Sequence, residues 1–196
     1  MKREATQIFY GMIDRSMSRN RVRIIGGEWR SRLVQFPDAP GLRPTPDRVR
    51  ETLFNWLGQR LDGLACLDLF AGSGALGFEA LSRGARRVVM VERDRATAAA
   101  LRVSAAKLEA VNLDIVQSDA IRFLEQPRER FDVVFVDPPY AENLAPAVLQ
   151  RLAPHLAQGA RVYAESATPV DLPPGWQVLR EDRAGAVRFA LYGRAQ

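Results

Sequence analysis

The fold is decided by residues 67–77, whose sequence is Leu67-Asp68-Leu69-Phe70-Ala71-Gly72-Ser73-Gly74-Ala75-Leu76-Gly77. Residues 72–77 match the pattern G-x-G-x-x-G, which follows a strand and opens a helix in dinucleotide-binding units. Glycines let the backbone turn sharply and approach a ligand closely. Because glycines also simply make turns, the pattern needs its surroundings before it indicates a ligand. The segment predicts a strand, a turn and a helix.

Outward from this segment the chain alternates between strand patterns and helix patterns. Strands are predicted over residues 64–70, 87–91, 113–117, 131–136 and 160–165, and helices over residues 75–82, 97–108, 121–124 and 144–156. Pro154 can end the last of these helices early. Residues 176–180 and 187–191 predict a closing antiparallel hairpin with its turn at Ala184-Gly185. This alternation predicts an α/β, Rossmann-like fold with a mostly parallel sheet covered on both faces. Ligands of such sheets bind beyond the carboxyl ends of the strands.

The first 50 residues differ from the rest of the chain. Residues 21–36 predict a small β-hairpin around Gly26-Gly27, and a proline-rich linker follows it. Thr45 and Pro46 are expected to open a helix as its N-cap and its first residue. We therefore divide the chain into a leader (1–18), a basic hairpin (19–42) and a larger domain (43–196).

The positive charge is concentrated in this N-terminal part. Residues 1–50 carry 11 basic and 5 acidic side chains, whereas the remaining residues carry 17 basic and 18 acidic ones. A basic end on a nearly neutral domain suggests a polyanionic partner, usually a nucleic acid. A solvated tail would give the same charge pattern, so both interpretations stay open.

The composition of the chain indicates in which cellular compartment the protein is expected. The one cysteine excludes an internal disulfide, which fits a reducing cytoplasm. The longest apolar runs have about six residues, far fewer than the roughly 20 of a membrane helix. No export signal is recognisable at the N-terminus. We expect a cytoplasmic, membrane-independent protein and favour a monomer.

Acidic residues at strand ends indicate the cofactor. Glu92 ends the strand after the glycine turn, where it can accept hydrogen bonds from two ribose hydroxyls. Asp68 stands where a nicotinamide-binding strand is normally apolar, and its carboxylate suits the ammonium group of a methionine moiety. Asp119 can accept from an adenine amine or act as a helix N-cap. Together these residues predict S-adenosylmethionine as the cofactor.

The sequence Asp137-Pro138-Pro139-Tyr140 carries the most specific chemistry. The two prolines fix the backbone, so that the Asp137 carboxylate and the Pro138 carbonyl can both accept from one amine. Accepting hydrogen bonds from both N–H groups of the amine aims the nitrogen lone pair at a methyl carbon. Tyr140 would stack on the base, a contact worth about 1–3 kcal/mol. The alternative is a rigid loop with a buried tyrosine.

Other reactive side chains are expected to be structural. His155 falls within a predicted helix, and Cys66 falls within a predicted buried strand. A buried thiol argues against methylation at a pyrimidine C5, which requires a thiolate nucleophile. The sequence shows no Cys/His cluster with metal-ligand spacing, so no metal is expected.

These motifs resemble those of a known family, the bacterial RsmD-type 16S ribosomal RNA guanine-N2 methyltransferases. The resemblance covers about residues 20–193 and rests on Arg23-Ile24-Ile25-Gly26-Gly27-Glu28-Trp29-Arg30, Arg43-Pro44-Thr45, Asp47-Arg48-Val49-Arg50-Glu51, the glycine turn, Val91-Glu92 and the Asp137–Tyr140 motif. It implies a class I Rossmann-like methyltransferase that modifies one guanine of 16S rRNA in the small ribosomal subunit. The cofactor contacts it implies are Asp68, Phe70, Gly72, Gly74, Glu92 and Asp119, with Arg43 and Thr45 helping to close the site.

With this resemblance the basic hairpin is interpreted as an RNA clamp. The candidate contacts are Arg19, Arg21, Arg23, Trp29, Arg30 and Arg32. Packing of Trp29 beneath the hairpin is the alternative for that residue.

Three other functions remain open at this point. An adenine-N6 methyltransferase acting on RNA or DNA would use the same Asp137–Tyr140 motif. An NAD-dependent oxidoreductase would use the same glycine pattern, although Asp68 argues against it. A non-enzymatic RNA-binding assembly factor would not need the acidic strand ends.

Overall fold

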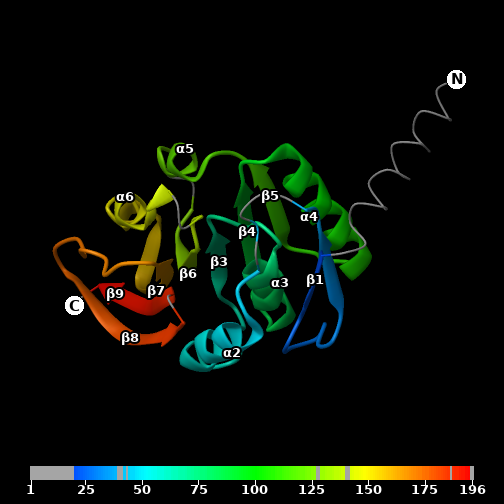
Figure 1. Ribbon diagram of the computed structural model, residues 1–196, viewed down its shortest axis with the longest axis horizontal. Helices are drawn as coiled ribbons and strands as arrows, with labels where there is room; N and C mark the ends of the chain where they lie inside the picture. Colours follow the sequence, from blue (N-terminus) through cyan, green and yellow to red (C-terminus); the bar gives the residue numbers. More distant parts are fainter. Residues whose placement is uncertain are drawn as a thin grey trace, which may run out of the picture.

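The architecture is an α/β sandwich, shown in Figure 1. The computed structural model describes residues 20–38, 42, 44–126, 129–139, 142–185 and 187–194. The predicted leader 1–18 and the candidate site residues Arg19, Arg43 and Tyr140 lie outside these described residues.

The described residues form a seven-stranded sheet and a separate two-stranded sheet. The strands of the large sheet are β3 (Ala65–Asp68), β4 (Arg87–Glu92), β5 (Leu113–Gln117), β6 (Phe131–Val136), β7 (Leu156–Ser166), β8 (Trp176–Ala184) and β9 (Val187–Arg194), in the order β5-β4-β3-β6-β7-β9-β8. Strands β3 to β7 pair in parallel, and β9 pairs antiparallel with both β7 and β8. The predicted mostly parallel sheet with a closing hairpin is confirmed. The strand order reverses between β3 and β6, which is where such sheets bind ligands.

Helices cover both faces of the sheet because successive strand residues point to opposite sides. One face packs against α2 (Asp47–Trp56), α3 (Ala75–Ser82) and α4 (Arg95–Leu108). The other face packs against α5 (Ala120–Leu124) and α6 (Ala145–Leu149). The β3 strand illustrates the alternation, since Cys66 belongs to the first core and Leu67 to the second.

The small sheet is the predicted N-terminal hairpin, formed by β1 (Asn20–Arg23) and β2 (Leu33–Phe36). Its inward side chains, Val22 and Val34, are buried in the core that α2, α3 and α4 share. The hairpin also contacts α4, where the Ser104 hydroxyl donates to the Gln35 carbonyl over 3.2 Å. The hairpin is therefore packed into the larger domain through an apolar interface.

Two expectations about local structure are wrong. Thr45 is not the N-cap of α2, because the helix begins at Asp47 with Pro46 at the capping position and no side-chain cap. The predicted helix over residues 144–156 breaks into α6, a 3-10 turn over Ala153–His155 and the first residue of β7. Pro154, inside that turn, has no N–H to continue a helix.

Among the described residues, no helix combines the length and the apolar character that crossing a membrane requires.

Candidate active site

The glycine turn lies at the carboxyl end of β3 and is held against β4. The Ala71 N–H donates to the Val91 carbonyl over 2.9 Å, and the Gly74 N–H donates to the Ala71 carbonyl over 2.6 Å. Gly74 adopts a φ of 77°, and a Cβ there would lie 2.5 Å from the Phe78 ring. A larger residue would therefore be strained in its backbone and would also collide with the helix that follows.

Asp68 ends β3 and is buried beneath this turn. Its Oδ2 accepts from the Gly77 N–H over 3.1 Å, whereas its Oδ1 has no hydrogen-bond partner in the described part of the chain. Burial raises the pKa of Asp68 to about 7, opposed by the Gly77 and Phe70 N–H groups. An unpartnered buried carboxylate oxygen is costly unless a donor reaches it. A ligand ammonium group would satisfy this oxygen.

Glu92 ends the neighbouring strand β4 and ties the turn to it. Its Oε2 accepts from the Gly72 N–H over 2.9 Å, and its Oε1 accepts from the Asp94 N–H over 2.8 Å. Each carboxylate oxygen can accept a second hydrogen bond. Glu92 is thus fixed in orientation and can still receive two ribose hydroxyls.

The remaining candidate cofactor residues are placed differently. The Asp119 Oδ1 accepts from the N–H groups of Ile121 (2.9 Å) and Arg122 (3.1 Å), so Asp119 is the N-cap of α5. Its contact with an adenine amine stays a prediction. Phe70 is partly buried against the α5–α6 core. Leu42 covers Gly72, because a Cβ on that glycine would lie 2.8 Å from the Leu42 Cδ1.

Asp137 follows β6 and is held by a residue from the N-terminal part of the chain. Its Oδ2 accepts from the Thr45 hydroxyl over 3.0 Å. Burial and the negative charges of Glu165 and Asp68 raise the pKa of Asp137 well above its ordinary value, and the hydrogen bond from Thr45 opposes this rise. Pro138 is buried and Pro139 is exposed. Thr45 thus contacts the predicted catalytic motif directly.

Glu165 is a further residue of the candidate site that the sequence motifs did not indicate. It is buried on β7, and its Oε1 accepts from the Tyr163 hydroxyl over 2.8 Å. Since Val136 pairs with Ala164, Glu165 and Asp137 lie beside each other at the carboxyl edge of the sheet. The signal available in the sequence was the position of Glu165 as the last residue of the predicted strand 160–165, the same kind of position that Glu92 holds on its strand. With Asp68, the ends of three adjacent strands present carboxylates, which favours a cationic ligand.

The candidate RNA contacts are spread along the hairpin. Arg21 and Arg23 are exposed on β1, and Arg30 is exposed in the turn. Arg32 donates to the Lys107 carbonyl over 2.7 Å. The Trp29 side chain is partly buried against the core, and the backbone N–H of Trp29 donates to the Ser82 hydroxyl over 2.9 Å.

The turn of the hairpin lies far from Asp137 in the fold. Ser82 ends α3, and α3 runs away from the glycine turn, so Trp29 and Arg30 sit near the opposite edge of the sheet. The structure does not bring Trp29 and Asp137 together.

Two side chains predicted to be structural are buried. The His155 Nε2 lies 3.0 Å from the Leu124 carbonyl oxygen, which joins the 3-10 turn to α5. Burial raises the pKa of the Cys66 thiol to about 12, so little thiolate forms at neutral pH. In the part of the chain that the structure describes, no cluster of three His, Cys, Asp or Glu residues could hold a metal ion.

Comparison with known proteins places the chain in a family. A family model described as conserved hypothetical protein 95 matches residues 22–193. The chain belongs to this family. The ribosomal RNA small subunit methyltransferase D of Escherichia coli is 47% identical over 178 residues, covering 88% of this chain and 90% of the relative. The protein of the same name from Haemophilus influenzae is 41% identical over 183 residues, covering 89% and 95%.

A solved structure supports the same assignment. A candidate methyltransferase from Escherichia coli superimposes with a TM-score of 0.82 at 46% identity, covering 90% of this chain and 100% of that chain. The expected resemblance to RsmD-type methyltransferases is confirmed by these relatives and by the family model. The fold of this family member is the class I methyltransferase fold.

Proposed function

We propose that this protein transfers a methyl group from S-adenosylmethionine to the exocyclic N2 amine of a guanine in 16S rRNA. The observation that carries the proposal is the position of Asp137, which Thr45 holds at the same sheet edge as Asp68 and Glu92. Relatives named ribosomal RNA small subunit methyltransferase D support the choice of substrate.

The cofactor would be held by the β3 and β4 strand ends. The unpartnered Oδ1 of Asp68 fits the ammonium group, and the oriented Glu92 carboxylate fits the ribose hydroxyls. Gly72 and Gly74 let the backbone approach the ligand closely. When bound, the cofactor supplies an electrophilic methyl carbon that is already activated.

The amine would be held by the segment after β6. The Asp137 carboxylate and the Pro138 carbonyl would accept hydrogen bonds from its two N–H groups, which directs the nitrogen lone pair toward the methyl carbon. As the new N–C bond forms, the amine would give up one of its two protons to the Asp137 carboxylate and keep the other. Because the donor is already activated, positioning supplies most of the rate. The raised pKa of Asp137 makes its carboxylate a better proton acceptor than an exposed aspartate. We propose Tyr140 as the stacking partner of the base.

The RNA itself would be held mainly by charge. We propose the basic hairpin of residues 19–42 as the contact surface, with the exposed Arg21 and Arg23 on β1 facing the phosphates near the target guanine. Arg30, in the hairpin turn, would contact only RNA that extends to the opposite edge of the sheet. The target guanine would be unstacked into the pocket beside Asp137. The reaction then belongs in the cytoplasm, on small-subunit rRNA.

Nucleoside mass spectrometry tests the proposal. Purified protein, S-adenosylmethionine and unmodified 16S rRNA are incubated, both as naked RNA and as assembled subunits, with the Asp137→Asn variant as the control. We expect N2-methylguanosine in the wild-type reaction alone. Formation of N6-methyladenosine would instead show that adenine is the substrate. Binding of NAD without binding of S-adenosylmethionine, measured by calorimetry, would reject the methyltransferase function.

A further inference from the structure

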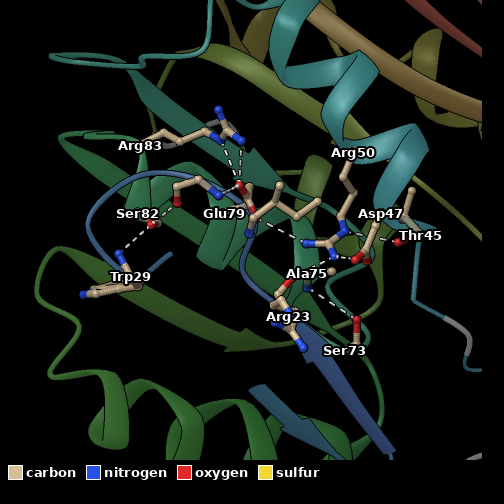
Figure 2. A network of polar contacts seen from close by, with 12 residues as sticks. Arg23, Trp29, Thr45, Asp47, Arg50, Ser73, Ala75, Glu79, Ser82 and Arg83 are labelled. Carbon is tan, nitrogen blue, oxygen red and sulfur yellow. Dashed lines mark hydrogen bonds and ion pairs between the residues drawn. The ribbon is translucent and has the colours of Figure 1, made fainter. Parts of the chain in front are cut away.

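A buried arginine connects the N-terminal hairpin with the catalytic segment. Arg50, on α2, is fully buried and donates to four groups (Figure 2). Its Nε donates to the Thr45 carbonyl (3.2 Å), its Nη1 to the Glu79 carboxylate (3.2 Å), and its Nη2 to the Arg23 carbonyl (2.8 Å) and the Asp47 carboxylate (2.6 Å). The planar guanidinium holds these groups in a fixed arrangement.

Glu79, the buried partner of Arg50, fixes the hairpin from the other side. Its two oxygens accept from the Ile25 and Gly26 N–H groups, both over 2.8 Å, and it also pairs with Arg83 over 2.8 Å. Figure 2 shows Glu79 between the two arginines. The docked hairpin turn, Glu79 and Arg50 therefore form one connected unit.

The connection ends at Asp137. Thr45 is buried, its carbonyl accepts from Arg50, and its hydroxyl donates to the Asp137 Oδ2. We propose that Arg50 is a positioning residue for methyl transfer, which holds Thr45 so that the threonine hydroxyl fixes the Asp137 carboxylate. This inference rests on the proposed role of Asp137 in binding the amine.

The hydrogen bond from Thr45 has an electrostatic consequence. The charged groups of the described chain that act on Asp137 are Glu165 on β7 and Asp68 on β3, and both disfavour its ionised form. A hydroxyl donor favours the ionised form. Moving Thr45 away therefore raises the pKa of Asp137 further and leaves its carboxylate free to rotate away from the amine.

The first test changes the hydroxyl itself. Thr45→Val keeps the shape of the side chain and removes the donor, whereas Thr45→Ser keeps the donor. We expect Thr45→Val to lower kcat about tenfold and to move the acid limb of the kcat–pH profile to higher pH, with KM for S-adenosylmethionine within about twofold of the wild type. Thr45→Ser restores both quantities. An acid limb that stays in place in Thr45→Val would overturn the proposal.

The second test separates positioning from stability. Arg50→Lys and Arg83→Lys each weaken a contact with Glu79, but the Arg83 side chain has no contact with Thr45. We expect both variants to lower Tm, and Arg50→Lys alone to lower kcat and shift the acid limb. Equal effects of the two variants on the kcat–pH profile would show a purely structural role.

A milder variant covers the case in which Arg50→Lys fails to fold. Asp47 is exposed and accepts a hydrogen bond from the Arg50 Nη2, so Asp47→Ala removes one of the contacts that hold Arg50. The buried Arg50 guanidinium keeps its ion pair with Glu79 in this variant. We expect a smaller shift of the acid limb in the same direction as in Thr45→Val. An unchanged acid limb would overturn the role of Arg50.

A readout without turnover distinguishes this inference from the proposed function. The pKa of Asp137 is followed by carboxyl ¹³C NMR in wild-type protein and in Thr45→Val. A higher pKa in the variant supports the positioning contact even if the wild type methylates no RNA, a result that would reject the proposed function alone. Equal pKa values would reject the positioning contact even in an active enzyme.

Discussion

At the residue scale, we expect replacement of Asp137 to separate binding of S-adenosylmethionine from methyl transfer. Asn has the same shape as Asp but presents an amide that donates toward the substrate amine. We expect Asp137→Asn to lower kcat by about 10²–10⁴-fold. Calorimetry should give an S-adenosylmethionine Kd within about twofold of the wild type, because Asp68 and Glu92 are the residues proposed to hold the cofactor. A parallel loss of cofactor affinity would mean that Asp137 belongs to the cofactor site.

Asp68 makes stability depend on pH. The folded chain retains a proton on Asp68 up to a pKa of about 7, whereas an ordinary aspartate releases it near 3.8. The folded state therefore binds more protons in this interval, and its stability falls as pH rises from about 4 through 7. The shift corresponds to as much as about 4 kcal/mol.

The variant Asp68→Asn checks this dependence, because it removes the titrating group. We expect it to unfold at a higher Tm than the wild type at pH 8, with the difference shrinking toward pH 4. Scanning calorimetry across this range measures the effect. The exposed Asp171→Asn should follow the wild type at every pH. A constant difference between Asp68→Asn and wild type would contradict the assigned pKa.

Single residues were predictable where a strand pattern ends in a carboxylate. The placement of Asp68, Glu92 and Asp137 at one edge of the sheet was predicted in this way, because the carboxyl ends of parallel strands share one edge. The partnership of Thr45 with Asp137 was not predictable, since 92 positions separate them in the chain. A threonine before a proline is also a typical helix N-cap pattern. Such a pattern depends on neighbouring residues only, so it does not indicate that the Thr45 hydroxyl donates to the distant Asp137 carboxylate.

At the scale of elements, the hairpin arginines can be tested by their salt dependence. Arg21 and Arg23 are exposed, and their side chains make no hydrogen bond or ion pair within the described ranges. We expect Arg21→Gln with Arg23→Gln to reduce the slope of log Kd for RNA against log salt by about 1.4, the value for two single-strand phosphates. Cofactor affinity should not change.

Arg60→Gln is the matched control for this measurement. Arg60 is exposed, follows α2 rather than lying on β1 or β2, and pairs locally with Asp62 over 2.6 Å, so a neighbouring carboxylate already offsets its charge. Its replacement should leave the slope unchanged. If the double variant also kept the wild-type slope, the hairpin strands would not contact phosphates. Deleting the hairpin would be a poorer experiment, because Val22 and Val34 belong to the core.

Helices and strands were predictable where the apolar residues follow a single pattern. The β6 strand was found with its observed bounds because six consecutive residues are largely apolar and the segment is buried. In residues 144–156 the leucines and alanines repeat as in one helix, and Pro154 indicated that this helix could end early, but α6 ends at Leu149 and a 3-10 turn contains Pro154. Apolar spacing alone does not distinguish one helix from two short ones.

At the scale of the whole molecule, the hairpin and the larger domain should unfold together. Gly27 has a φ of 77°, and a Cβ there would lie 1.8 Å from the Ser82 carbonyl oxygen. Gly27→Ala should therefore displace the hairpin turn from α3 and lower stability by about 2 kcal/mol or more. That corresponds to a Tm lower by roughly 4–8 °C for a chain of this size.

The control for this variant is Gly159→Ala. Gly159 has a similar φ of 72°, but a Cβ there would meet nothing within 4 Å. Both variants carry similar backbone strain, so the difference between their free energies of unfolding measures the contact between the hairpin turn and Ser82. We expect circular dichroism and tryptophan fluorescence to report the same single transition in Gly27→Ala. An early fluorescence transition would show that the hairpin detaches independently.

The order of strands in the sheet also determines when the sheet can finish folding during synthesis of the chain. The last strand, β9, lies between β7 and β8, although β8 precedes it in the sequence. A growing chain that has not yet reached residue 187 cannot place β8 in the sheet, and the edge of β7 remains unpaired. Unpaired edges promote association between chains. Nascent or truncated forms that lack β9 are therefore the species most exposed to aggregation and proteolysis.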